Sequence, residues 1–151
     1  MQYFKNVGEV LDFAIREEEK ARDFYLDLAG RVERPAMKKN FEEFAQEEQK
    51  HRDRLLEVKE GRREVKPSQE VPDMKMSDYL VDVIPSEDMD YGDALILAMK
   101  REKAAYRLYT RLAEVVDDDN LQQVFKSLAS EEAKHKMAFE VEYDEHYMAE
   151  N

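Results

Sequence analysis

Apolar residues recur every three or four positions through four long stretches of the chain, a spacing typical of amphipathic helices. Helix start signals stand at the head of these stretches, for example Asn6 followed by Glu9, and Asp119 followed by Gln122. Gly and Pro, which interrupt helices, number only four each. We therefore predict an all-α fold, with helices over about 6–32, 35–61, 87–116 and 119–147.

Residues 62–86 break the helical pattern and carry three of the four prolines. Such a stretch is typical of a long connection, and we expect it to contain a short helical piece over 76–84. The third helix should then follow a cap at Ser86 or Asp90. We expect the C-terminal residues 142–151 to fray.

The two halves of the chain match when one is shifted by 84 residues. In the first and third helices the matching positions are Ala14, Glu18, Ala21, Tyr25 and Leu28 with Ala98, Glu102, Ala105, Tyr109 and Leu112. In the second and fourth helices they are Phe41, Ala45, Glu47, Glu48, Lys50 and His51 with Phe125, Ala129, Glu131, Glu132, Lys134 and His135. This repeat predicts one domain over 1–151, a four-helix bundle made of two repeated helical hairpins joined by a long crossover.

Polar residues interrupt the four apolar seams at matching places. One glutamate lies within the seam of the first helix and one within that of the third, and a Glu-x-x-His motif lies in each of the other two seams. Three residues of helix turn about 300° and rise about 4.5 Å, so both side chains of each motif share one face. Four uncompensated carboxylates in a core would cost several kcal/mol each or become protonated. Two divalent cations would neutralise them, which predicts a two-metal site formed by Glu18, Glu48, His51, Glu102, Glu132 and His135.

A single Glu-x-x-His would carry little weight, since 22 of the 151 residues are glutamate. The weight comes from two such motifs on apolar seams at one repeat offset, matched by two further inward glutamates. Glu17 and Glu19 are expected to face outward. Glu47 and Glu131 stand one turn before the histidines and could orient them.

Two repeated tyrosines, Tyr25 and Tyr109, are open to two interpretations: core aromatics, or members of the layer around the metals. Buried hydroxyls need partners, and the glutamates of the second and fourth helices are the expected ones. We expect His146 to be a surface histidine.

The remaining composition narrows the partners. A net charge of −12 argues against nucleic acid or an anionic membrane as a partner. Without cysteine there is no disulfide and no thiolate-bound metal. No apolar run approaches 18 residues and the N-terminal residues lack a signal-peptide pattern, so we expect a cytoplasmic protein.

Four segments carry a family resemblance: AIREEEKARDFYLDLA, FAQEEQKHRDRL, AMKREKAAYRLYTRLA and LASEEAKHKMAF. They resemble the ligand helices of the rubrerythrin group within the ferritin-like superfamily. The resemblance implies a ferritin-like bundle that binds two irons and reacts them with hydrogen peroxide or oxygen. It places the family's carboxylate ligands at Glu18, Glu48, Glu102 and Glu132, and its histidines at His51 and His135.

Two departures from that group follow from the sequence. Rubrerythrins proper add a rubredoxin-like domain whose cysteines hold a further iron, and this chain has no cysteine. They also carry an extra carboxylate one turn before the third-helix glutamate, where this chain has Met99. We therefore expect a separate electron donor protein, and we expect the chain to form a homodimer.

Four functions remain open at this stage. The first is a di-iron oxidoreductase that uses hydrogen peroxide or oxygen, and the second a ferroxidase that stores or passes on iron. The third is a bundle with an inert structural metal, and the fourth an oxygenase acting on RNA or a fatty chain. Manganese is the alternative metal, since carboxylate and imidazole ligands accept both.

Overall fold

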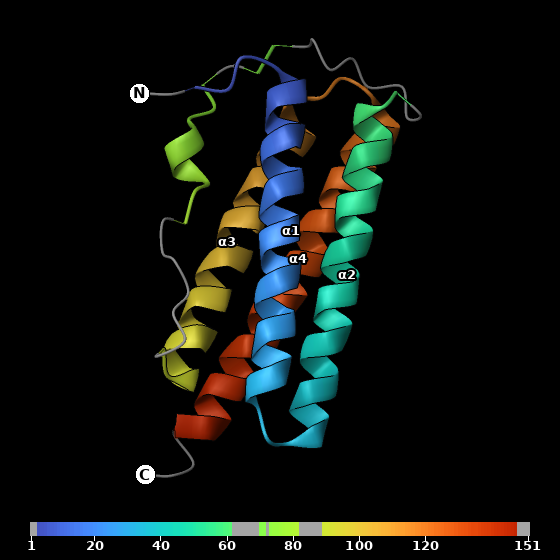
Figure 1. Cartoon of the computed structure of the whole chain (residues 1–151). Helices are drawn as coiled ribbons and strands as arrows, with labels where there is room; N and C mark the ends of the chain where they lie inside the picture. Colours follow the sequence, from blue (N-terminus) through green and yellow to red (C-terminus); the bar gives the residue numbers. More distant parts are fainter. Residues whose placement is uncertain (1–2, 62–69, 72, 82–88, 148–151) are drawn as a thin grey trace.

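The computed structural model of the chain describes residues 3–61, 70–71, 73–81 and 89–147. Its helices are α1 (Val7–Arg31), α2 (Pro35–Lys59), the 3-10 helix η1 (Met76–Asp78), α3 (Tyr91–Val115) and α4 (Asp119–Tyr147). The predicted all-α four-helix bundle is confirmed (Figure 1). Within the described ranges, no helix is long and apolar enough to cross a membrane.

The starts of α1 and α3 follow caps in the sequence. The predicted cap of α4 at Asp119 is wrong, because the side chain of Asp118 accepts a hydrogen bond of 2.9 Å from the backbone N–H of Leu121 instead. The Asn6 side chain accepts a hydrogen bond of 2.9 Å from the backbone N–H of Glu9 at the start of α1. Asp90 does the same for Asp93 at 2.8 Å, so α3 begins directly after Asp90. The expected start near 87 and the expected helical piece over 76–84 fall partly on 82–88, outside the described residues. Among the described residues of that piece, only η1 is helical.

The helices pack as two hairpins, α1 with α2 and α3 with α4, with much less direct contact between α1 and α3. Figure 1 shows α1 and α3 running in opposite directions, with η1 beside α3. Buried apolar side chains form two clusters, one toward the start of α1 and one toward its end. The six polar residues singled out in the sequence lie between these clusters, so the core is divided by a polar layer.

The end of α4 differs from expectation. Residues 142–147 were expected to fray, but α4 continues to Tyr147. Glu142 is buried and accepts hydrogen bonds from Arg34 and, at 3.1 Å, from the Tyr91 hydroxyl. Arg34 belongs to the first hairpin and Tyr91 to the second, so this buried carboxylate ties the hairpins together. The expected fraying is therefore wrong for 142–147, while 148–151 lie outside the described residues.

Candidate metal centre

The polar layer brings together all six residues predicted from the seams. Each is at most 4% exposed, although glutamate and histidine usually reach water. Every one of the four helices contributes, α1 and α3 with a glutamate each and α2 and α4 with a Glu-x-x-His pair each. The residues are Glu18, Glu48, His51, Glu102, Glu132 and His135.

The six side chains form two overlapping groups, each with ligand atoms within 4.8 Å of one another. One group consists of Glu18, Glu48, His51 and Glu132, and the other of Glu48, Glu102, Glu132 and His135. Glu48 and Glu132 belong to both groups. This arrangement suits two neighbouring cations held by two shared carboxylates, with one further glutamate and one histidine for each cation.

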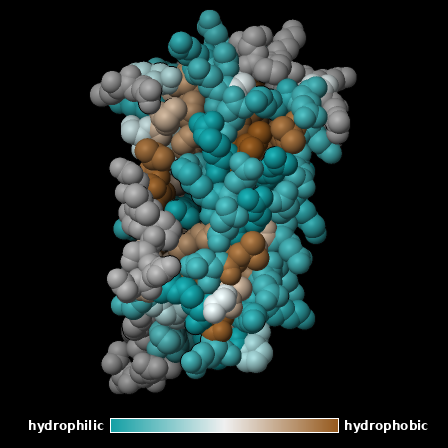
Figure 2. All heavy atoms as spheres, in the orientation of Figure 1, coloured by the Kyte–Doolittle hydropathy of each residue, from teal (hydrophilic) through white to brown (hydrophobic). Residues whose placement is uncertain are grey.

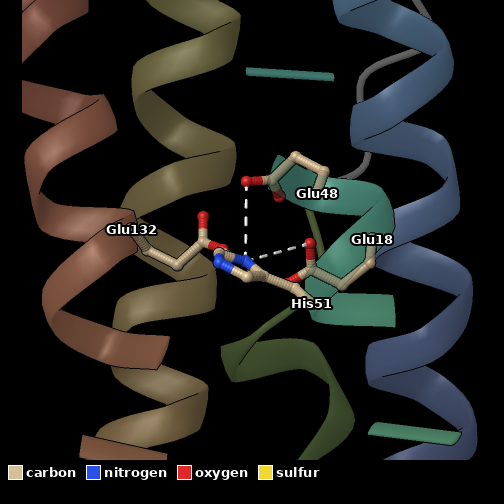
Figure 3. A group of neighbouring side chains, drawn as sticks. All are labelled: Glu18, Glu48, His51 and Glu132. Atoms are coloured by element: carbon tan, nitrogen blue, oxygen red, sulfur yellow. Dashed lines mark hydrogen bonds and ion pairs between the residues drawn. The ribbon is translucent and has the colours of Figure 1, made fainter. Parts of the chain in front are cut away.

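His51 shows how one half of the centre is built (Figure 3). Its Nδ1 lies 2.7 Å from Glu132 Oε1, and 3.7 Å from both Glu18 Oε2 and Glu48 Oε1. The other half repeats the pattern, with His135 Nδ1 at 3.0 Å from Glu48 Oε1 and 3.7 Å from a Glu102 oxygen. In both halves Nδ1 is the ring nitrogen that faces the buried carboxylates of the two ligand groups.

The outer ring nitrogens contact a second pair of glutamates, and these contacts cross between hairpins. His51 Nε2 lies 2.5 Å from Glu131 on α4, and His135 Nε2 pairs with Glu47 on α2. The sequence suggested that each glutamate orients the histidine one turn after it on the same helix. Instead each contacts the histidine of the other hairpin, because α2 and α4 face one another across the centre. Such partners fix the ring orientation and leave Nδ1 for a metal.

The two tyrosines are also paired across hairpins. Tyr25 on α1 donates to Glu102 on α3, and Tyr109 on α3 donates to Glu18 on α1. The expected partners, the glutamates of α2 and α4, are therefore wrong. Helical side chains lean toward the N-terminus of their helix. Since α1 and α3 are antiparallel, each tyrosine leans back toward the centre and meets the glutamate of the opposite helix.

Crowded carboxylates shift one another's pKa values. Burial, followed by the charges of Glu18 and Glu102, raises the pKa of Glu48 well above its usual range. Burial and the charges of Glu102, Glu18 and Glu48 do the same for the pKa of Glu132. The two shared carboxylates are thus the ones that most resist ionisation when no cation is present.

The histidines shift in the direction that favours their charged form. Burial pulls the pKa of His135 down, but Glu102 and Glu47 outweigh it and raise the value to about 9. For His51, burial is outweighed by Glu18 and Glu131, and the pKa is raised. Burial raises the pKa of Glu18, but bonds with Glu48, His51 and Tyr109 lower it overall. Protonated histidines therefore offset part of the negative charge in the metal-free chain.

Several buried atoms of the centre have no hydrogen-bond partner among the described residues. These atoms are one oxygen of each of the four glutamates and Nδ1 of His135. An unpartnered buried polar atom is costly, and native proteins rarely leave several together. All five atoms are metal-ligand atoms of the kind that divalent iron or manganese binds. The side chains present therefore fit a metal site.

The remaining candidates lie outside this group. Glu17 pairs with Lys20 at 3.2 Å and Glu19 lies 3.5 Å from Arg52, and neither belongs to the two ligand groups. Met99 packs against the apolar cluster toward the end of α1. His146 is half-buried, with its ring 5.1 Å from that of Tyr91.

Sequence reasoning missed one buried carboxylate, Glu142. It lies seven residues after His135, on the same face of α4, and follows Phe139 in the seam. A helical period extended past Phe139 would have found it. Its Arg34 and Tyr91 partners come from other elements and could not be read from that period.

Known proteins resemble this chain in sequence and in fold. The family model described as rubrerythrin matches residues 9–143. A search of curated proteins found no significant match. Among solved structures, a protein from Thermotoga maritima described as ferritin-like diiron-carboxylate superposes with a TM-score of 0.81 at 22% identity. That superposition covers 96% of this chain and 98% of the other, and it shows a ferritin-like fold.

Proposed function

The chain belongs to the rubrerythrin family, and on that premise we propose that it is a di-iron oxidoreductase in which hydrogen peroxide or dioxygen oxidises the reduced metal pair. The observation that carries the proposal is the pair of overlapping ligand groups that share Glu48 and Glu132. Shared carboxylates keep two metals close enough to react with one oxidant together. The family and the buried Glu and His side chains support a di-iron centre, while manganese is the alternative metal.

The protein's own residues supply charge balance and fixed geometry. Four carboxylates match the charge of two divalent cations, and the two histidines add neutral ligands through Nδ1. When bound, two ferrous ions would supply two electrons, enough to reduce one hydrogen peroxide to two waters. The apolar clusters on both sides of the layer keep bulk water away from this chemistry.

Tyr25 and Tyr109 hold the carboxylates that each belong to one group only. Each hydroxyl donates to one oxygen of its glutamate and leaves the other unpartnered among the described residues. That second oxygen is the one left for a metal. Burial and the nearby glutamates raise the pKa of both tyrosines well above the usual value, so they remain donors at any physiological pH.

A ferroxidase that passes on or stores iron is the second candidate. The observation that favours it is the pair of half-exposed carboxylates, Glu47 and Glu131, that contact the outer edges of the histidines. Exposed carboxylates beside buried ligands offer a stepwise path for a cation between solvent and the centre. An oxidoreductase needs no such traffic, because its metals stay bound.

The deciding experiment is metal analysis of protein purified without oxygen, followed by the optical spectrum after one equivalent of hydrogen peroxide. We expect two irons per chain and a ferric spectrum that returns to the start when an electron donor protein is added. His135→Ala should lose at least one iron, and the matched His146→Ala should keep both. Two tightly bound irons with an unchanged spectrum in His135→Ala would overturn the site.

The assembly separates the two candidates. We propose a homodimer served by a separate electron donor, with neither nucleic acid nor membrane as a partner. Light scattering of the purified protein should give twice the chain mass. A closed cage of many subunits that retains oxidised iron in excess of two per chain would favour storage instead.

A further inference from the structure

A narrow cavity connects the metal centre with the α1–α3 side of the bundle. All four site carboxylates line it, and neither histidine does. Its remaining walls come mostly from small or apolar side chains of α1 and α3. We call this cavity the α1–α3 passage. Its apolar wall includes Phe13, Ala14, Ala21, Ala104, Ala105 and Leu108, and the side chains of Glu17, Arg101 and Tyr109 also line it.

The passage has room for a very small molecule. The volume open to the centre of a water-sized sphere is about 30 Å³. One water needs about 10–15 Å³ of such volume, so the passage holds a water or two, or one diatomic molecule. A hydroperoxide with a branched carbon group does not fit this space.

Two residues that precede α3 lie over the passage. Tyr79 and Val81 both line it, and Figure 1 places this part of the chain alongside α3. Tyr79 packs against the apolar cluster toward the start of α1, and Val81 against the cluster toward its end. The exterior seen in Figure 2, with α1 in front, is largely hydrophilic with small separate apolar patches. Tyr79 and Val81 therefore form part of the outer wall of the passage.

The opposite side of the centre is wide but closed to the carboxylates. A groove of about 470 Å³ lies between α2 and α4, and we call it the α2–α4 groove. It reaches the two histidines but none of the four site carboxylates. The His51 and His135 rings lie nearly parallel with centroids 6.2 Å apart, and Phe44 packs on His135 at 4.7 Å. These rings form a wall between the groove and the centre.

Resting on the proposed function, we propose that the oxidant enters through the α1–α3 passage, which admits dioxygen and hydrogen peroxide and excludes organic hydroperoxides. The reaction itself would allow either peroxide class. Reduction of either ROOH needs two electrons, which a bound ferrous pair would supply, and two protons from solvent; the O–O bond breaks, and ROH and water leave. Selection is therefore by size, before the chemistry begins.

Stopped-flow oxidation of the di-ferrous protein by hydrogen peroxide and by tert-butyl hydroperoxide tests the size limit. Tyr79→Ala should raise the rate of oxidation by tert-butyl hydroperoxide roughly tenfold and leave the rate with hydrogen peroxide nearly unchanged. Ala105→Leu should lower the rate of oxidation by hydrogen peroxide roughly tenfold while two irons stay bound. Tyr106→Ala and Ala133→Leu, matched changes on the α3–α4 surface away from the passage, should change neither rate.

A second measurement needs no redox reaction. In zinc-loaded protein under dioxygen pressure, paramagnetic relaxation of alanine methyl groups reports where dioxygen resides. Ala14 and Ala94 are both fully buried, but only Ala14 lines the passage. We expect faster relaxation at Ala14 than at Ala94, and we expect Ala105→Leu to remove the difference.

The outcomes separate this inference from the proposed function. Enhanced relaxation at Ala14 in a protein whose ferrous iron resists both hydrogen peroxide and dioxygen would support the passage and overturn the oxidoreductase. Wild-type protein oxidised equally fast by both peroxides would support the oxidoreductase and overturn the passage. Equal relaxation of Ala14 and Ala94 would also overturn the passage.

Discussion

The two sides of the metal centre differ in width and in lining residues, although the two halves of the sequence repeat one another. The α1–α3 passage is narrow and reaches the four site carboxylates between largely apolar walls. The α2–α4 groove is wide, has charged walls and reaches the edges of the two histidines. The internal repeat relates α1 to α3 and α2 to α4, so exchanging the two repeats exchanges the two walls of each side and maps each side onto itself. An internal repeat therefore makes the metal positions alike while leaving the two sides free to diverge.

The largest effect should come from the carboxylates that both sides share. Glu48→Ala or Glu132→Ala removes a ligand from both groups, so we expect binding of both metals to fail. Glu102→Ala removes a ligand from one group and should leave one metal bound. Metal content per chain after desalting measures this difference. If Glu48→Ala and Glu102→Ala lose the same amount of metal per chain, Glu48 is not a ligand of both metals.

Metal removal should also change how stability depends on pH. The raised pKa values of Glu48 and Glu132 contribute stability below the unfolded value of 4.5, which is lost as pH rises through the folded values. The raised pKa of His135 contributes stability below pH 6.5, which is lost as pH rises through about 9. The raised pKa of His51 acts in the same direction. Glu18 opposes these ligands, since its lowered pKa contributes stability above pH 4.5.

The melting temperature of the chelated protein should therefore fall between about pH 6 and about pH 9. The metal-loaded protein should melt higher throughout and change less, because cations replace the protons. Calorimetry of both forms across this range is the measurement. A chelated form that gains stability with rising pH would show that the carboxylates do not repel as proposed.

A smaller effect is expected from the glutamates of the α2–α4 groove. Glu131→Gln keeps the shape but weakens the contact that orients His51, so metal affinity should fall about 10- to 100-fold. Glu47→Gln should do the same through His135. Glu43→Gln, an exposed change on α2, is the matched control. Competition with a chelator of known affinity gives the values, and an unchanged affinity in both variants would deny these glutamates an orienting role.

The smallest effect concerns the tyrosines near the α1–α3 passage. Tyr25→Phe removes one hydrogen bond to Glu102 and should cost about 1 kcal/mol of stability in the metal-free form. In the loaded form the cost should shrink, since the metal also holds Glu102. Urea unfolding of both forms provides the comparison. Equal costs in the two forms would mean that tyrosine and metal do not share the task of holding this carboxylate.

Residues whose signal lies within one helix could be predicted from sequence. Asn6 marked the start of α1, whereas Asp90 was one of two candidate starts for α3. The apolar seams and their repeat identified the six residues that the fold brings together. The crossed partners of Glu47 and Tyr25 could not be predicted, because they depend on which helices face each other and how the side chains lean. Glu142 lay within reach of the period but was assigned to a frayed end.

The crossed contacts of histidines and tyrosines constrain how the two repeats can change. His51 relies on Glu131 and Tyr25 on Glu102, each partner belonging to the other repeat. Two identical copies of one hairpin, assembled as a pair, could make all these contacts, so the centre is compatible with an origin by duplication of a hairpin that once paired with itself. After fusion, a substitution in one repeat changes the surroundings of a ligand in the other. The repeats must therefore evolve as a coupled pair at these positions, even where their outer surfaces drift apart.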